Sequence, residues 1–214
     1  MGRRKVALAN GCHYHVFNKS IAGFEIFRSR DEFLRMREVL RFYRTAFAGR
    51  CFSQAVSLGK TRATDFHGPA RCRVIAYCVM PTHLHLFLEQ LTTDGISDYM
   101  RSVMHSYGSF FNLRMNRRGP LWESRFKCVM VTEDAHALHL ARYIHLNPTS
   151  AGLSKRPEDW EFSSYHEYLH LLQGEGFCEF KQLMSFSPEN FRHFTEQRAE
   201  YQKSLQTIKY LLLD

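Results

Sequence analysis

Residues 72–89 read CRVIAYCVMPTHLHLFLE, two β-rich runs on either side of a short break. Residues 72–79 contain branched and aromatic side chains, which favour a strand. Met80-Pro81-Thr82 interrupts this run, because proline has no backbone N–H to give to a sheet. A second strand is predicted from His83 onward. Because only this short turn connects them, the two strands are expected to pair as antiparallel neighbours.

The sequence before this pair predicts a strand, a helix and a loop. Residues 12–17, CHYHVF, alternate as a strand does. Ser29 with Glu32 three residues later makes a capping box, which predicts the start of a helix. The apolar side chains that follow at helical spacing are Phe33, Met36, Leu40, Tyr43 and Phe47. Residues 49–71 show no sustained period and predict a long exposed loop within reach of substrate.

The sequence after the pair predicts a helix, a strand and two further helices. Asp94 is expected to cap a helix whose apolar face holds Ile96, Met100, Val103, Tyr107 and Phe110. Residues 126–131 predict a strand, and the next helix should run from Thr132 to Asn147, where Pro148 follows. Ser187 and Pro188 mark the start of a last, long helix.

This order of elements predicts an α+β fold, an antiparallel sheet with helices packed on it. Within that class, a split βαβ or ferredoxin-like arrangement is preferred. The predicted units are a catalytic domain at residues 1–173 and a helical C-terminal extension at residues 174–214.

Composition favours one globular core with a polyanionic partner. The chain has 214 residues, 44% of them hydrophobic, and a formal net charge of +8. Residues 1–130 carry 21 Lys/Arg against 9 Asp/Glu, whereas residues 131–214 carry 8 against 12. A basic body suggests nucleic acid, although surplus basic residues also serve solubility. The six cysteines form no CxxC pair and are expected to be reduced. No apolar run approaches the roughly 20 residues of a membrane helix, so a cytoplasmic location is expected.

Two histidine pairs have the spacing of metal ligands. His83 and His85 lie two apart on a predicted strand, so both side chains leave the same face. Imidazoles side by side can share a divalent ion. His13 and His15 have the same spacing on the first strand. Spacing alone does not choose between the pairs, and either could be two ordinary strand histidines.

The helix predicted from Thr132 to Asn147 carries a polar stripe. At 100° per residue, His136, His139, Tyr143 and Asn147 fall close together, beside an apolar arc that should face the core. The arc consists of Ala137, Leu140, Ala141 and Ile144. The polar stripe could present imidazoles, a phenol and an amide to a ligand. Alternatively, Tyr143 could be a half-buried packing residue.

Three separated segments together resemble a known family. MPTHLHLFLE, GPLWESRFK, and ARYIHLNPTSAGL followed by RPEDWEFSSY are similar to the REP-associated branch of the single-tyrosine HUH transposases. The resemblance runs from about Cys12 to Tyr168. Thr82 stands where the family often has Asn. The match does not explain His136, His139 or the acidic C-terminal part.

The resemblance implies an HUH endonuclease that cleaves and rejoins single-stranded DNA. His83, His85 and Asn147 would bind a divalent metal ion, Mg²⁺ or Mn²⁺, and Tyr143 would be the nucleophile that forms a 5′-phosphotyrosine. The metal, Arg142 or His139 could help the phenol to lose its proton. The implied substrates are hairpin-forming palindromic repeats, and a monomer is favoured over a homodimer.

Basic and aromatic side chains are the candidate DNA contacts. They are Arg117, Arg118, Trp122, Arg125, Lys127 and Arg142. Trp122 could instead pack in the core with Phe126.

Two other functions fit the same residues. A noncatalytic module that binds single-stranded nucleic acid could use this fold and a basic surface. A metal-dependent phosphoesterase could use His83 and His85 to activate water, and it would form no covalent intermediate.

Overall fold

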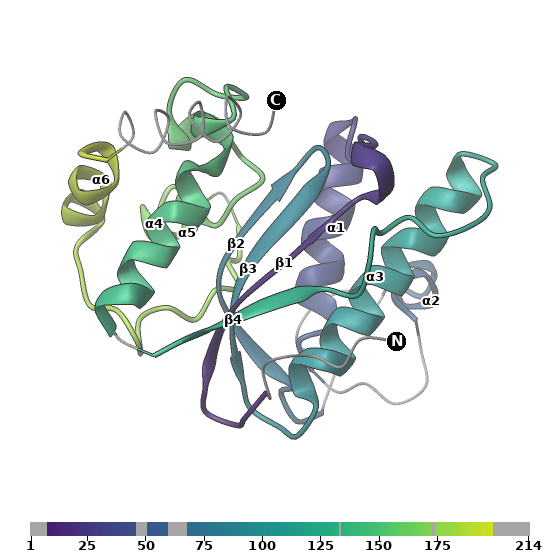
Figure 1. Ribbon diagram of the computed structural model, residues 1–214, viewed down its shortest axis with the longest axis horizontal. Coiled ribbons are helices and arrows are strands. Elements are labelled where there is room, and N and C mark those ends of the chain that lie inside the picture. Colours follow the sequence, from purple (N-terminus) through teal and green to yellow (C-terminus); the bar gives the residue numbers. More distant parts are fainter. Residues whose placement is uncertain (1–7, 46–50, 60–67, 133, 173, 199–214) are drawn as a thin grey trace.

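The computed structural model describes residues 8–45, 51–59, 68–132, 134–172 and 174–198, and it contains a four-stranded antiparallel sheet (Figure 1). The strands are β1 (His13–Lys19), β2 (Cys72–Met80), β3 (His83–Gln90) and β4 (Lys127–Val131), in the order β2-β3-β1-β4. β2 and β3 form the expected hairpin, and β1 lies between β3 and β4. This order is that of a split βαβ sheet, so the α+β, ferredoxin-like prediction is confirmed.

Helices cover both faces of the sheet (Figure 1). α1 (Arg30–Phe42) and α3 (Gly95–Arg114) lie on one face, with the short α2 (Phe52–Ser57) beside them. α4 (Asp134–Ser150) lies on the other face, together with α5 (Tyr165–Tyr168) and α6 (Pro188–Glu196). The described residues also include the 3-10 turns η1 (Ile21–Gly23) and η3 (Pro157–Asp159). Within the described ranges, every helix is too short or too polar to cross a membrane.

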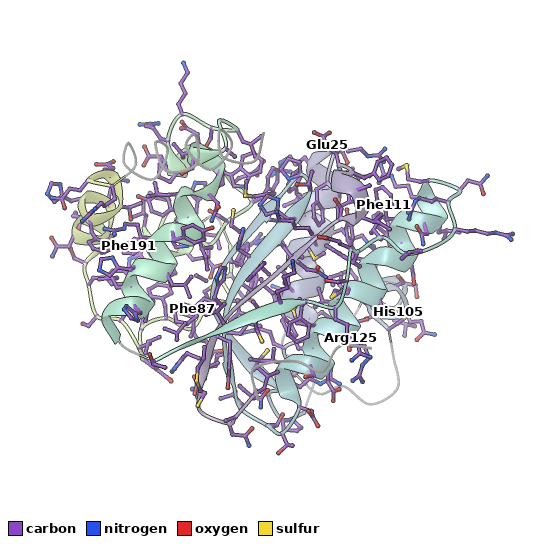
Figure 2. The ribbon with its side chains drawn as sticks, in the orientation of Figure 1. Glu25, Phe87, His105, Phe111, Arg125 and Phe191 are labelled. Atoms are coloured by element: carbon purple, nitrogen blue, oxygen red, sulfur yellow. The ribbon has the colours of Figure 1, made fainter. Side chains whose placement is uncertain are left out.

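Each face of the sheet has its own hydrophobic core. The core under α1 and α3 takes alternate residues of β1 and β3, among them Tyr14, Val16, Leu84, Leu86 and Leu88. The core under α4 is built around Phe87, which Figure 2 shows on the sheet, and Phe191, which it shows on α6. Both rings are at most 1% exposed, and burying a side chain of this size contributes about 1.5–3 kcal/mol.

The register between β1 and β3 decides which residues face α4. Lys19 pairs with His83, Phe17 with His85, and His15 with Phe87. Residues directly opposite each other project from the same face, so the odd-numbered side chains of both strands lie on the α4 side. A slip of one residue would send them into the α1 and α3 core.

The predicted loop at residues 49–71 contains a helix, and this part of the prediction is wrong. α2 buries Phe52 and Ala55, and the ring of Phe52 meets that of Phe42 at 5.3 Å between centroids. Six residues are too few for a helical period to stand out in the sequence. Residues 60–67 of the expected loop, and Phe47 of the expected helix face, lie outside the described residues.

Helix starts and ends also differ from expectation in two places. Asp94 precedes α3 as predicted, but its φ of 58° is left-handed and its side chain makes no cap hydrogen bond. α4 does not stop at Asn147: it continues through Pro148 to Ser150. Proline removes one helical hydrogen bond, yet the turn is held by bonds from Ala151 N–H to Asn147 and from Leu153 N–H to Pro148.

Residues after Gly174 pack against the rest of the fold. The buried carboxylate of Glu167 accepts hydrogen bonds from the backbone N–H groups of Phe177 and Cys178, each at 2.8 Å. Ser187 caps α6 as predicted, accepting from Asn190 N–H at 3.2 Å. Phe177 belongs to the α1 and α3 core and Phe191 to the α4 core. Residues 199–214, where the expected last helix would continue, lie outside the described residues.

Gly95 is expected to be required for stability, because a Cβ there would lie 2.2 Å from the carbonyl oxygen of Arg71. Gly95→Ala should therefore destabilise the protein, by about 1–3 kcal/mol for a clash of this kind. Gly108, in the same helix, is the matched control: its nearest neighbours would be 3.9 Å away. Gly108→Ala should stabilise by roughly 0.5–1 kcal/mol. Urea unfolding measures both, and equal midpoints for the two variants would contradict the assignment of the close contact.

Candidate active site

The two histidines of β3 stand on the sheet face that α4 covers. His85 is 8% exposed, and its Nδ1 lies 2.9 Å from Nε2 of His15 on β1. His83 follows the turn between β2 and β3, and its Nδ1 lies 2.9 Å from the hydroxyl of Thr82. The Nδ1 atom of each ring is therefore engaged, and these contacts leave each Nε2 for a ligand.

Tyr143 of α4 lies next to the rings of His85 and His15. Its ring centroid is 5.8 Å from that of His85 and 5.9 Å from that of His15, edge-on in both cases. The Tyr143 side chain is 37% exposed, so substrate can reach it. The fold thus brings together the nucleophile and the histidine pair that the sequence predicts, although they are almost 60 residues apart in the chain.

Asn147 lies one helical turn after Tyr143 and is 2% exposed. Its side-chain amide donates to the carbonyl oxygen of Tyr143 at 2.9 Å. This bond uses the nitrogen of the amide and leaves its oxygen, the atom that a hard divalent ion prefers. Because α4 continues through Pro148, Asn147 keeps a helical backbone and stays on the turn next to Tyr143.

Burial sets the protonation states of this site. Desolvation lowers the pKa of His83 to about 4 and holds the pKa of His85 well below its usual range, and the nearby charge of Lys19 lowers both further. Neutral imidazole is the form that binds metal ions. Burial also raises the pKa of the Tyr143 phenol. A hydrogen bond from the Asn147 side chain has the smaller, opposite effect of lowering this pKa. The phenol is therefore a poor nucleophile without help.

The donor set suits a divalent ion with few protein ligands. Two neutral imidazoles and one amide oxygen are available from His83, His85 and Asn147. Across the described parts of the chain, no group of three or more His, Cys, Asp or Glu side chains has a metal-binding arrangement. An ion at this site would accordingly share phosphate oxygens and water, which suits magnesium or manganese.

The structure distinguishes the His83/His85 pair from the His13/His15 pair, which have the same spacing in the sequence. His13 lies away from the Tyr143 site: its Nε2 is 3.9 Å from the carboxylate of Glu89, and its ring is 6.0 Å from that of Phe87. His15 joins the site through its contacts with His85 and Tyr143.

Two of the proposed DNA contacts have structural partners. Trp122 is 9% exposed in the α1 and α3 core, and its indole N–H donates to the carbonyl oxygen of Met104 at 3.0 Å. Trp122 therefore packs in the core, which was the alternative to a DNA contact in the sequence analysis. The guanidinium of Arg117 bonds to Asn112 and to the carbonyl oxygen of Pro120, so it braces its own turn.

Arg142 lies on α4 but contacts α6. Its guanidinium stacks at 4.1 Å from the ring centroid of Phe194 and donates to the carbonyl oxygen of that residue. Its other terminal nitrogen is 2.7 Å from Nδ1 of His139. Arg142 and His139, both considered as helpers of Tyr143, thus bind the C-terminal segment.

The remaining basic candidates are exposed. Arg118 and Arg125 are exposed in the connection between α3 and β4, and Lys127 is exposed on β4. Lys127 pairs with Phe17 in the register of β1 and β4, which puts it on the same face as His85.

Sequence reasoning missed Lys19 and His145. Lys19 is exposed opposite His83, and its charge acts on both β3 histidines. The alternation of HYHVFNK at residues 13–19 places Lys19 on the same face as His15, so the sequence pattern could have indicated it. His145 is fully buried and bonds to the hydroxyl of Ser164 at 2.7 Å. Nothing in its spacing separates it from a surface histidine.

Part of the chain is similar to proteins of a known family. Residues 60–147 match the family described as "Transposase IS200 like". This segment contains His83, His85, Tyr143 and Asn147. The chain is also similar to a candidate REP-associated tyrosine transposase of Haemophilus influenzae, with 24% identity over 102 residues. That match covers 43% of this chain and 58% of the relative's length.

A solved structure has the same fold. It is that of a REP-associated tyrosine transposase bound to a REP hairpin, and it aligns with a TM-score of 0.50 at 18% identity, covering 88% of this chain and 96% of that one. The chain is therefore similar to the REP-associated tyrosine transposases in part of its sequence and in its fold. The resemblance that its motifs indicate is confirmed.

Acid is expected to destabilise the protein. Burial lowers the pKa of His15 and His83 to about 4 and that of His145 to about 3. Histidines of the unfolded chain titrate at about pH 6.5, so between that pH and about 4 the unfolded state binds more protons. The free energy of unfolding should therefore fall as the pH falls through this interval. Urea unfolding at a series of pH values measures this dependence.

A His145→Leu variant is the control for this pH dependence. It removes one buried imidazole, so its stability should fall less steeply than that of the parent over the same interval. A parent midpoint that does not change with pH would contradict the neutral, buried state of these histidines.

Proposed function

We propose that this protein is a transposase that cleaves and rejoins single-stranded DNA through Tyr143, with a divalent metal ion at His83, His85 and Asn147. The observation that carries the proposal is the edge-on approach of the partly exposed Tyr143 ring to His85, 5.8 Å between centroids. A phenol beside a pair of neutral imidazoles combines a nucleophile with a ligand set for a Lewis acid.

The proposed cleavage step is an attack by Tyr143 on a DNA phosphate. The phenol oxygen of Tyr143 attacks the scissile phosphorus, and the bond from phosphorus to the 3′ oxygen breaks. The phenol loses its proton, and the departing oxygen gains one to become a 3′ hydroxyl. The product is a 5′-phosphotyrosine, whose bond energy allows a 3′ hydroxyl to attack in reverse and join a strand without ATP.

The metal site would be held by the two Nε2 atoms and the Asn147 amide oxygen. When bound, magnesium or manganese would polarise the scissile phosphate and stabilise its developing charge. Burial lowers the pKa of both His83 and His85, so at neutral pH they are available as ligands without competition from protons. The amide of Asn147 ties this site to Tyr143 through the backbone of α4.

Deprotonation of Tyr143 is a step that the site must assist. Burial raises the pKa of this phenol, so its ionised form is scarce at neutral pH. Arg142 is stacked on Phe194 and paired with His139. Lys19, whose charge acts on both β3 histidines, is therefore the side chain proposed for this role, and a bound divalent ion would supply further positive charge. Lys19 stands opposite His83 on β1.

The DNA ligand is proposed to be a hairpin-forming repeat. The solved relative is bound to a REP hairpin. In this chain, the exposed Arg118, Arg125 and Lys127 would contact phosphates, and Lys127 lies on the sheet face of the active site. A monomer is proposed, in which the site takes β1, β3 and α4 from one chain and α6 packs on α4.

A covalent adduct is the expected product of a first experiment. The parent is incubated with labelled single-stranded hairpin DNA from repeats that flank the gene, in the presence of Mn²⁺, and run on a denaturing gel. The parent should form an adduct, and Tyr143→Phe should form none, because no phenol oxygen remains to attack. Chelation of the metal should also abolish the adduct.

A matched control is Tyr165→Phe, which changes a buried tyrosine on the same side of the sheet and should leave the adduct intact. Cleavage that survives in Tyr143→Phe would instead indicate a phosphoesterase that activates water. DNA binding without any cleavage would indicate a noncatalytic single-stranded nucleic-acid-binding module.

A further inference from the structure

His15 and His85 form a direct imidazole pair across two strands. β1 and β3 are neighbours, and His85 pairs with Phe17, two residues along from His15. His15 Nε2 lies 2.9 Å from His85 Nδ1, and the two rings are inclined by only 21°. The ring of Phe17 lies near both, with its centroid 5.0 Å from that of His15, at a tilt of 36°, and stacked at 5.9 Å from that of His85. The orientation of the pair is therefore fixed by the sheet.

A hydrogen bond between two neutral imidazoles has a direction. One nitrogen must carry the hydrogen and the other must offer its lone pair. If His15 donated, His85 would carry its own proton on Nε2 and could not ligate a metal through that atom. If His85 donates from Nδ1, its Nε2 is left unprotonated, as a ligand must be.

We propose that His15 is a positioning residue that accepts the Nδ1–H of His85 and so holds its Nε2 free for the metal ion. This inference rests on the proposed function, since it concerns the same metal site. His15 acts through His85 and is not itself a ligand. Its own proton is then on Nδ1.

Thr82 stands in the corresponding place for the second histidine. Its hydroxyl oxygen is 2.9 Å from Nδ1 of His83 and can accept the same kind of bond. Both rings of the pair thus have a polar atom at Nδ1, one from a neighbouring strand and one from the preceding residue. This shared arrangement is what two Nε2 ligands facing one ion require.

The tautomer of His85 can be observed directly in the metal-free protein. Long-range proton–nitrogen NMR spectra distinguish a protonated from an unprotonated ring nitrogen, and they need no variant for the first observation. The expected result is a protonated Nδ1 and an unprotonated Nε2 at His85. A protonated Nε2 at His85 would overturn the proposal.

Metal affinity gives the second measurement. Calorimetric titration with Mn²⁺ is carried out in the Tyr143→Phe background, so that no covalent chemistry contributes. His15→Phe keeps the ring size and removes the acceptor, and it should weaken Mn²⁺ binding by roughly 10–100-fold, the usual effect of losing such a partner. His15→Gln offers an amide oxygen as acceptor and should recover most of the affinity.

His13→Phe is the matched control, because His13 lies on the same strand and face but contacts Glu89. It should bind Mn²⁺ as its parent does. Urea midpoints establish that each variant is folded. Unchanged Mn²⁺ affinity in a folded His15→Phe, or no Mn²⁺ binding in the Tyr143→Phe parent, would overturn the inference. Normal metal binding with no DNA adduct in the unmodified protein would overturn the proposed function alone.

Discussion

The pairing register of β1 and β3 is the constraint on which both the fold and the site depend. Tyr14 and Val16 point into one core with Leu84 and Leu86, while His15 and His85 point to the other face. Hydrophobic burial of the even-numbered residues holds the register, because a shift by one position would expose them to the other side. The histidines are therefore placed by the packing of their neighbours, and they contribute little to the energy that places them.

Burial under α4 has opposite effects on the two kinds of reactive group. It keeps the imidazoles of His83 and His85 neutral, which favours metal binding. It also raises the pKa of the Tyr143 phenol, which disfavours attack. A positive charge near the phenol reconciles the two requirements, since it stabilises the phenolate without protonating the imidazoles. Lys19, whose charge acts on the β3 histidines, and the proposed metal ion are the candidates for this charge, whereas Arg142 is engaged by Phe194.

Local sequence pattern predicts much of this structure. Alternation and capping identify the four strands, the main helices and the shared face of His83 and His85, because these features depend on neighbours within a few residues. Long-range packing decides the rest. The choice of His15 over His13 as a site residue requires the β1 and β3 register, and the core position of Trp122 requires α3. The contact of Arg142 with α6 joins residues about 50 apart, which no local period reveals.

The arrangement of the two cores also determines the order in which the parts of the site form during synthesis. The face of the sheet that carries Phe87 stays uncovered until α4 and α6 have been made, because Ile144 and Phe191 complete its core. Chains emerge from the ribosome N-terminus first, so the histidines are made before Tyr143, and α6, which packs on α4, comes later still. A nascent chain thus holds His83 and His85 before Tyr143 is aligned with them, and the proposed strand cleavage would have to await synthesis of nearly all of the described residues.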